Sequence, residues 1–128
     1  MRVISVVESM ISYAGGGIDI GVYDLMEKGL RESARVAVQK AAATLRDDEA
    51  RRSLTVTTDV LSGSPAEAIL EDAEAFGADW IFVGSHGHGR LERFMLGSVS
   101  QAVAGRAKCS VAIVRSPQAR TNENRISS

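Results

Sequence analysis

A regular alternation of short apolar runs with longer amphipathic stretches is the feature that most constrains what this chain can fold into. Val3–Val7 and Ser110–Val114 are nearly continuous runs of apolar, mostly β-branched residues, and Asp79–Gly84 is another largely apolar run. Such runs are typical of strands that are covered on both faces of a parallel sheet. In Leu54–Val60 apolar and polar residues alternate instead. This alternation predicts a strand with one solvent-exposed face, near the edge of the sheet.

The segment from Val22 to Arg46 predicts a long helix between the first and second strands. Its apolar residues recur every three or four positions and form one stripe, which we expect to pack on the sheet. The charged residues lie largely outside this stripe and are expected to face solvent. The apolar positions are Val22, Leu25, Met26, Leu30, Ala34, Ala37, Val38, Ala41 and Leu45.

Two further helices are predicted by the residues that start and end them. Ser64 as N-cap, Pro65 at the first helical position and Glu67 at the third form a capping box, and Gly77 is placed to end that helix. Ser98–Ala107 can form a short third helix. The order strand, helix, strand, helix, strand, helix, strand predicts an α/β fold. In this fold an open parallel sheet has right-handed crossovers and helices on both faces.

The composition is that of one globular domain. The chain has 128 residues, 45% hydrophobic and 24% charged, and 15 basic against 16 acidic residues give a net charge of −1. This balance gives no basic field that would attract nucleic acid or an anionic membrane, and no apolar stretch approaches the ~20 residues of a membrane span. The single cysteine, Cys109, fits a reducing compartment, so we expect a cytoplasmic protein. We expect one domain over residues 1–116 and a disordered polar tail over residues 117–128.

Glycines cluster at the place where such a fold binds ligands. Ligands of open α/β sheets lie at the carboxyl ends of strands, where loops meet helix N-termini. Gly84 ends a predicted strand, Gly87 follows it, and Gly97 and Ser98 open the third helix. Glycines let backbone N–H groups approach a ligand closely, and a helix N-terminus carries about half a positive charge. The spacing predicts an anion or nucleotide site. The alternative is that the glycines only build a tight turn and that Ser98 only caps its helix.

The same segment resembles the universal stress protein family. The resemblance is carried by Val83–Gly89, Gly97–Ser100 and Cys109–Arg115, and the match to the pattern G-2x-G-9x-G-S/T is complete. It covers residues 1–116 and is looser before the last third. The resemblance implies a Rossmann-like fold of the adenine nucleotide alpha hydrolase-like type. It also implies binding of ATP or a related adenine nucleotide, with or without Mg²⁺.

The resemblance further implies roles for individual residues. Val83 and Gly84 would face the ribose and adenine, and Val6 would match an apolar position that touches adenine. His86 and Gly87 would lie along the ribose and the α-phosphate. Backbone N–H groups and hydroxyls of four residues would bind the phosphates: Gly97, Ser98, Val99 and Ser100.

One departure from the family pattern concerns the start of the sheet. Family members usually begin with a strand that ends in an acidic residue near the adenine, followed by a helix. Here Val3–Val7 resembles the family's second strand, because a long glycine-rich loop and a long helix follow it, so the first strand and helix have no counterpart. In an alternative register Val3–Val7 is the first strand and Glu8 the acidic residue, but no amphipathic helix begins soon after. We expect the gap to be closed by pairing of Val3–Val7 with Trp80–Val83 or by a partner chain, and we favour an intertwined or obligate dimer.

The leading function is regulatory binding of an adenine nucleotide in a stress response, in a homodimer formed through the Ser110–Val114 strand. One alternative is a dimeric interaction protein of the same fold that no longer binds nucleotide, and another is a slow adenine-nucleotide hydrolase. We expect at most incidental hydrolysis, because no paired carboxylates lie near the glycine loop to hold a catalytic magnesium. His86 and His88 have no third ligand nearby and do not predict a metal site. Ser85 lacks the strand–elbow context of a nucleophile.

Overall fold

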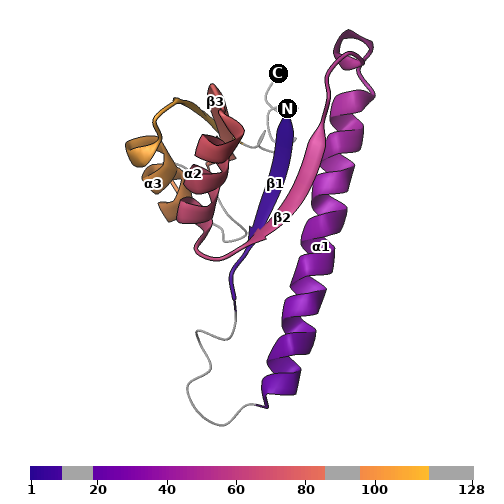
Figure 1. Cartoon of the computed structure of the whole chain (residues 1–128), viewed down its shortest axis with the longest axis vertical. Coiled ribbons are helices and arrows are strands. Elements are labelled where there is room, and N and C mark those ends of the chain that lie inside the picture. The colour runs from indigo at the N-terminus through magenta and orange to yellow at the C-terminus, as the bar shows by residue number, and fades with distance from the viewer. Residues whose placement is uncertain (10–18, 86–95, 116–128) are drawn as a thin grey trace, which may run out of the picture. The chain divides into compact units, whose positions relative to one another are not determined.

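The structure, a computed structural model, describes residues 1–9, 19–85 and 96–115. The chain divides into two compact units, Met1–Gly77 and Ala78–Ser128. Each unit holds one pair of parallel strands and at least one helix that packs against it (Figure 1). Both units are therefore built as the alternation predicts. The tail over residues 117–128 lies outside the described residues, and the prediction of a single domain over residues 1–116 stays a prediction.

The first unit is built around two parallel strands. β1 (Arg2–Val7) pairs with β2 (Thr57–Ser62), with the first residues of the two strands opposite each other. Between them the chain forms α1 (Ile20–Arg46) and a short 3₁₀ turn, η2 (Glu49–Arg51). After β2 it continues into α2 (Pro65–Phe76). Both α-helices pack on the strand pair.

These two helices cover opposite faces of the β1–β2 pair. Arg2, at the start of β1, donates hydrogen bonds to Asp72 of α2. Ser62, at the end of β2, accepts a hydrogen bond from Arg31 of α1. Ser62 pairs with Val7, and residues 2 and 7 of one strand point to opposite faces because strand side chains alternate. The predicted arrangement, with helices on both faces of a parallel sheet, is confirmed in this unit.

Helix α1 is much longer than the sheet that it covers. Its 27 residues extend ~40 Å, whereas the six residues of β1 extend ~20 Å. The buried residues of α1 are Val38 and Ala42, both in its C-terminal half. The expectation that the whole apolar stripe packs on the sheet is therefore wrong for its N-terminal members, which stay exposed: Val22, Leu25, Met26 and Leu30.

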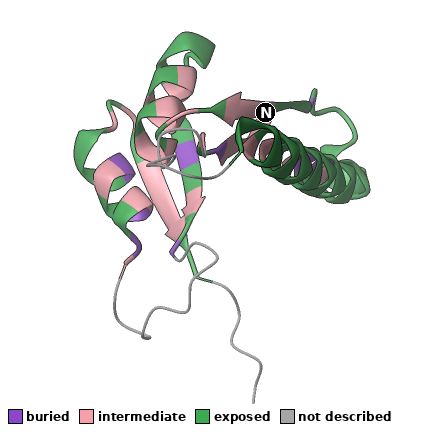
Figure 2. Cartoon of the chain, turned by 90° about the horizontal axis from the view of Figure 1, so that it is seen from below, coloured by how far each residue is buried: buried purple, intermediate pink, exposed green. Residues whose placement is uncertain are grey.

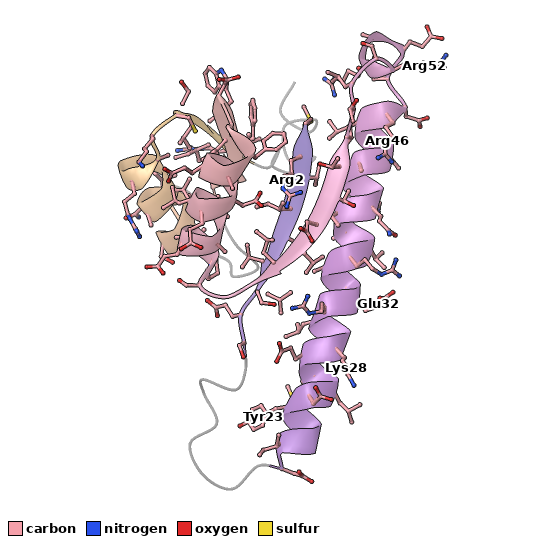
Figure 3. All side chains as sticks on the ribbon, viewed as in Figure 1. Arg2, Tyr23, Lys28, Glu32, Arg46 and Arg52 are labelled. Atoms are coloured by element: carbon pink, nitrogen blue, oxygen red, sulfur yellow. The ribbon has the colours of Figure 1, made fainter. Side chains whose placement is uncertain are left out.

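An arginine near the N-terminus ties β1 to α2. The Arg2 guanidinium donates from Nε to Oδ2 of Asp72 at 2.8 Å and from Nη2 to Oδ1 of the same carboxylate at 2.9 Å. A third hydrogen bond, also 2.9 Å, joins Nη2 to Asp59 of β2 (Figure 3 labels Arg2). The hydrogen bonds to Asp72 are the main cause that raises the pKa of Arg2 above its usual value, and those to Asp59 add to it. The cluster therefore fixes α2 against both strands with a permanently charged group.

We expect the substitution Asp72→Ala to destabilise the chain by about 1–3 kcal/mol, because it removes a bidentate, partly buried partner of a charged donor. Urea unfolding followed by far-UV circular dichroism measures the loss. The matched control is Asp24→Ala, which breaks the solvent-exposed ion pair with Lys28 and should change the midpoint little. Equal midpoints for the two variants would contradict the role given to Asp72.

The second unit repeats the design on a smaller scale. β3 (Trp80–Gly84) pairs in parallel with β4 (Ser110–Val114), and α3 (Ser98–Arg106) lies between them in the chain and packs against β4. Ile81 of β3 and Val103 of α3 are buried. Figure 2 colours the buried residues of the chain purple. Along β3 the alternate residues Trp80 and Phe82 are exposed, and their rings stack with centroids 6.0 Å apart.

Three element ends differ from or refine the expectations. β2 begins at Thr57 rather than at Leu54, whose side chain is 42% exposed and makes no part of a sheet face. Ser64 is the N-cap of α2, but its side chain makes no capping hydrogen bond, so the predicted capping box is not formed through this hydroxyl. Gly77 ends α2 with φ +70°, a left-handed conformation that favours glycine, as predicted.

The strand ladders of the described residues join β1 to β2 and β3 to β4 and no other pair. After its first residue β1 is apolar except for Ser5, as strands inside a parallel sheet mostly are, yet β2 is its only ladder partner in this part of the chain. Closure of the gap beside Val3–Val7, within the chain or by a partner, stays a prediction.

Candidate functional site

Three hydrogen bonds hold the carboxyl end of β3, one to β4 and two to the start of α3. The amide of Ser85 donates to the carbonyl oxygen of Val114 at 2.9 Å and so extends the β3–β4 pairing by one residue. The amide of Gly97 donates to the carbonyl oxygen of Ser85 at 2.8 Å. The hydroxyl of Ser100 donates to the carbonyl oxygen of Gly84. Residues from two segments, separated by ten residues outside the described part, therefore meet at one point of the second unit.

The first turn of α3 presents its backbone amides at this point. Gly97 is the N-cap and is buried, and Ser98 is the first helical residue and is exposed. The helix begins its own hydrogen bonding at Gln101, whose amide donates to the carbonyl oxygen of Gly97 at 3.0 Å. The amides of Ser98, Val99 and Ser100 consequently have no acceptor within the helix, as at any helix N-terminus. These orphan donors and the helix dipole favour an anion here.

The two glycines of the site do not serve a turn that only glycine could make. Gly97 has φ −61° and ψ 153°, which any residue adopts. Among the described residues the glycines with positive φ are Gly63 and Gly77, so Gly84 is not in the left-handed region either. The alternative that Gly84 and Gly97 only build a tight turn therefore loses its conformational reason. The remaining reason for glycine at these two positions is that a neighbouring segment or a ligand can approach a backbone without a side chain closely.

The predicted site residues divide into three groups. The structure brings the end of β3, at Gly84, together with the start of α3. The predicted residues at the start of α3 are Gly97, Ser98, Val99 and Ser100. Val83 directly precedes Gly84 on β3. Val6 belongs to β1 in the first unit, and its predicted contact with adenine stays a prediction. His86 and Gly87 lie outside the described residues.

Two serines have different roles from those expected. Ser98 is not the cap of α3: the N-cap is Gly97 and no side chain caps this helix, so the exposed Ser98 hydroxyl makes no hydrogen bond there. Ser100 is buried and its hydroxyl already has an acceptor, the Gly84 carbonyl. Of the two hydroxyls predicted to reach phosphates, that of Ser98 is the more available.

Sequence reasoning missed Ser85. The sequence points to Ser85 only as a nucleophile without the usual strand–elbow context, yet it is buried, with 3% of its surface exposed, and its backbone links β4 to the N-cap of α3. Its position directly after a strand that ends in glycine is the one signal that could have found it, because such a residue continues the ladder by one amide.

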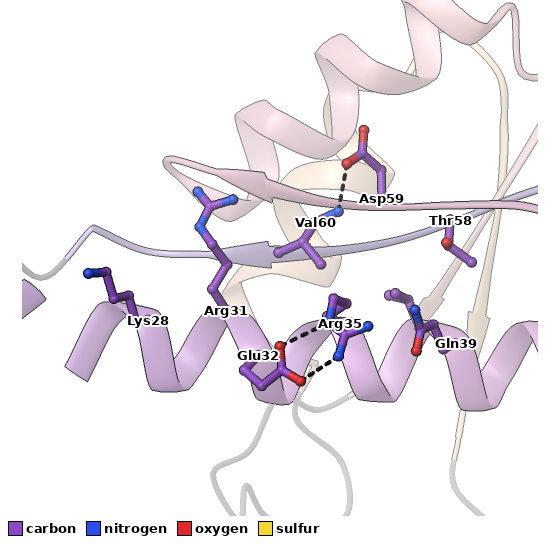
Figure 4. A pocket seen from close by; sticks show the side chains of 9 residues that line it. Lys28, Arg31, Glu32, Arg35, Gln39, Thr58, Asp59 and Val60 are labelled. Atoms are coloured by element: carbon purple, nitrogen blue, oxygen red, sulfur yellow. Dashed lines mark hydrogen bonds and ion pairs between the residues drawn. The ribbon is translucent and has the colours of Figure 1, made fainter. Parts of the chain in front are cut away.

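A groove lies between α1 and β2 within the first unit (Figure 4). Three cationic side chains line it, but each has a partner within the first unit. Lys28 pairs with Asp24 at 3.1 Å, Arg31 donates to the Ser62 hydroxyl, and Arg35 Nε donates to Glu32 at 2.9 Å. The hydrogen bond from Arg35 is the main cause that lowers the pKa of Glu32. Of these three cations Lys28 and Arg35 are neutralised by carboxylates, whereas Arg31 is held by a neutral hydroxyl, so the groove offers an anion less than the start of α3 does.

No group of three or more histidine, cysteine or acidic side chains within residues 1–9, 19–85 and 96–115 is arranged to hold a metal ion. Over the same residues, none of the helices combines the length and apolar content needed to cross a membrane.

Comparison with known proteins agrees with the architecture of both units. The family model described as "Universal stress protein family" matches residues 1–115. The universal stress protein MJ0531 of Methanocaldococcus jannaschii is 34% identical over 98 residues, which are 77% of this chain and 55% of that protein. Universal stress protein A homolog 2 of Coxiella burnetii is 36% identical over 119 residues, 90% of this chain and 73% of that protein. The solved structure of hypothetical protein MJ0577 superposes with a TM-score of 0.71 and 25% identity, over 90% of this chain and 74% of that one. This chain thus spans only about half of the M. jannaschii relative.

Proposed function

The chain belongs to the universal stress protein family, and from this premise we propose that it binds ATP or a related adenine nucleotide as a regulatory ligand in a stress response. The observation that carries the proposal is the buried glycine N-cap of α3, Gly97, with three backbone amides beyond it that have no helical acceptor. Such a terminus is suited to a phosphate group because both its donors and its dipole favour negative charge.

In this proposal different groups of the protein bind different parts of the nucleotide. The amides of Ser98, Val99 and Ser100 and the Ser98 hydroxyl bind phosphate oxygens. The backbone at Val83 and Gly84 lies along the ribose and adenine, because a strand that ends in glycine lets a ring approach. By family resemblance, His86 and Gly87 extend the contact along the ribose and α-phosphate, and Val6 touches adenine. Mg²⁺, when it accompanies ATP, is held by the phosphates.

The nucleotide acts in this proposal as a signal and not as a substrate to be turned over. The described residues around Gly97 provide donors for a phosphate but no carboxylate pair that would position magnesium and an attacking water. We therefore expect hydrolysis to be slow and incidental.

A second candidate is an interaction protein of the same fold that does not bind nucleotide. One observation favours it: the Ser100 hydroxyl is buried and donates to the Gly84 carbonyl, so one predicted phosphate ligand is used within the protein. In this candidate the bonds at the β3–α3 junction serve only to fix the helix on the strand.

Two measurements on the full chain separate these candidates. Freshly purified protein is denatured and its supernatant analysed for adenine nucleotides by mass spectrometry, and nucleotide-free protein is titrated with ATP and AMP in a calorimeter. Copurified nucleotide, or binding in the micromolar range, supports the regulatory proposal. Absence of both, at protein concentrations of about 100 μM, contradicts it and leaves the interaction protein. Phosphate release with magnesium, faster than slow incidental turnover, would instead support a hydrolase.

We also propose that the protein forms a homodimer through the outer edge of β4. Within the described residues β4 has one ladder partner, β3, and its sequence SVAIV contains no charge or proline of the kind that protects a free edge. We expect a dimer by light scattering and its dissociation in the variant Val114→Lys. Val114 is 52% exposed, so lysine is tolerated by the fold but opposes edge pairing. A wild-type mass that stays monomeric at high concentration would contradict this dimer.

We place the protein in the cytoplasm on the ground that its one thiol, Cys109, is free and part-buried, without a partner for a disulfide in the chain. Imaging of the full-length natural protein, tagged at its C-terminus, checks this proposal. A signal confined to the cell envelope would contradict it.

A further inference from the structure

Helix α1 has a second apolar face that the first unit leaves uncovered. Leu25 is 70% exposed and Val36 is 52% exposed, and Val22, Met26 and Leu30 are exposed by almost half. Figure 2 shows this long helix exposed along most of its surface, and Figure 3 shows side chains projecting along its whole length. Exposed apolar residues scattered singly need no explanation, but a contiguous set usually marks an interaction surface.

This set is contiguous because of its spacing on the helix. At about 100° per residue, its members fall on one arc about 140° wide, and the buried residues Val38 and Ala42 fall on the other side of the helix. Between residues 22 and 37 the arc contains no charged residue. We call this set the outer face of α1, and it consists of Val22, Leu25, Met26, Gly29, Leu30, Ser33, Val36 and Ala37.

Gly29 lies at the centre of the outer face and has no local explanation. A glycine inside a helix costs about 1 kcal/mol relative to alanine. Its backbone is helical, and a Cβ built on it would meet nothing within 4 Å, so neither conformation nor crowding within the chain requires glycine. A remaining physical reason is the close approach of another helix, which glycine permits. Val22 and Val36 stand seven residues before and after it, which is the repeat of paired helices.

We propose that the outer face is the docking surface for α1 of a second copy of this chain, packed antiparallel and crossing at Gly29. In this register residue i lies opposite residue 58 − i, so Val22 lies opposite Val36 of the second copy and Leu25 opposite Ser33 of the second copy. Val22 and Leu25 are thus matched by an apolar and a small side chain, whereas Met26 and Leu30 lie at the levels of Glu32 and Lys28 of the second copy. Antiparallel packing also places opposite ends of the two helix dipoles together.

The charges that flank the outer face fit a second copy of the same helix. Lys28 and Glu32 lie on one flank, and in this register Lys28 faces position 30 of the second copy, two residues from its Glu32. Because the arrangement is symmetric, two such ion pairs form. Within one chain Lys28 pairs with Asp24 and Glu32 with Arg35, on exposed surface where exchange of partners costs little. The contact is about 15 residues of one helix, below the size of a standard interface, so we expect association in the micromolar range.

Cysteine cross-linking tests the pairing and its direction. In a Cys109→Ser background, the variant Gly29→Cys should form a covalent dimer readily under mild oxidation, because residue 29 faces itself. Val22→Cys alone should not, since two copies of residue 22 lie ~20 Å apart along antiparallel helices. A mixture of Val22→Cys and Val36→Cys should cross-link. Ala50→Cys, exposed beyond the helix, gives the background rate.

Two outcomes of this cross-linking would overturn the proposal. Gly29→Cys that cross-links no faster than Ala50→Cys would exclude the contact. Self cross-linking of Val22→Cys as fast as that of Gly29→Cys would indicate parallel helices and would exclude the antiparallel register. Neither outcome depends on the β4 edge, because the covalent bond reports which residues meet.

A pair of matched substitutions tests the energetics in a Val114→Lys background, in which the proposed β4 contact is removed. In this background Leu25→Arg should weaken self-association at least tenfold in sedimentation equilibrium, whereas Leu54→Arg, the same change at an exposed leucine outside α1, should leave it unchanged. Both side chains are exposed in the single chain, so circular dichroism should find both variants folded. Equal association of the two variants would overturn the proposal. If Leu25→Arg unfolds the chain, Gly29→Leu replaces it, since leucine favours the helix but blocks the crossing.

Discussion

We expect the substitution Gly97→Val to abolish nucleotide binding, with a loss of affinity of at least about thirtyfold, ~2 kcal/mol. Gly97 is buried at the N-cap of α3, and its φ of −61° is open to valine, so strain in the backbone is not the cause. The branched side chain would instead stand where the phosphates must approach the three amides of the first turn. Calorimetric titration with ATP measures the loss.

The control for this experiment lies at the other end of the same helix. Gly105 is exposed near the end of α3, and a Cβ there would meet nothing within 4 Å. Gly105→Ala should leave nucleotide affinity within twofold and stabilise the helix by up to about 1 kcal/mol. Binding by Gly97→Val that equals binding by Gly105→Ala would move the site away from the start of α3. A Gly97→Val protein that has lost the native fluorescence of Trp80 would not be a valid test, and Gly97→Ala would then replace it.

The sequence predicted most element positions because the relevant signals are local. β4 spans Ser110–Val114 as expected, and α3 starts at Ser98. The end of α2 at Gly77 follows from a residue that takes a left-handed conformation at little cost. Each of these signals depends on neighbouring residues alone, so no knowledge of the tertiary structure is needed to interpret them.

The predictions from sequence failed where the burial of a residue depends on which other element packs against it. Periodicity gave α1 one apolar stripe, but strands of six residues cannot cover a helix of 27. Steps of three and four also combined residues from different sides of α1, since at about 100° per residue Leu25 and Val38 point about 140° apart, and only the position of the strands decides which of these sides is buried. The same holds for Leu54, which alternates like a strand residue but precedes the paired segment.

The candidate site was predictable in location but not in the use of its hydroxyls. The end of β3, the glycines Gly84 and Gly97, and the start of α3 can all be recognised in the sequence. Hydrogen bonds bring them together in the second unit, as expected. Whether a serine hydroxyl is free depends on an acceptor elsewhere: that of Ser100 is the carbonyl of Gly84, sixteen residues away. The sequence therefore predicts the hydroxyls of Ser98 and Ser100 equally as phosphate ligands, whereas in the structure that of Ser100 already has an acceptor within the protein.

A second large effect is expected in the core of the second unit, where Val103→Ala should lower the free energy of unfolding by about 2 kcal/mol. Val103 is fully buried, with 0% of its surface exposed, and it is the largest side chain buried to this degree among the described residues. Removal of its two methyl groups leaves a cavity that a short helix of nine residues can close only in part. Urea unfolding followed by Trp80 fluorescence measures the change, because the chain's single tryptophan lies in the same unit.

Two valine-to-alanine controls make this last measurement specific. Val114→Ala, at an exposed position of the same unit, should shift the transition little, and a shift equal to that of Val103→Ala would contradict a core role for Val103. Val38→Ala removes a buried valine from α1 in the first unit. If the two units unfold as one cooperative body, Val38→Ala shifts the Trp80 transition as Val103→Ala does, because in a two-state transition every buried contact supports the same equilibrium. If each unit unfolds by itself, only Val103→Ala shifts the Trp80 transition, and the loss from Val38→Ala is seen by circular dichroism in the helix of the first unit.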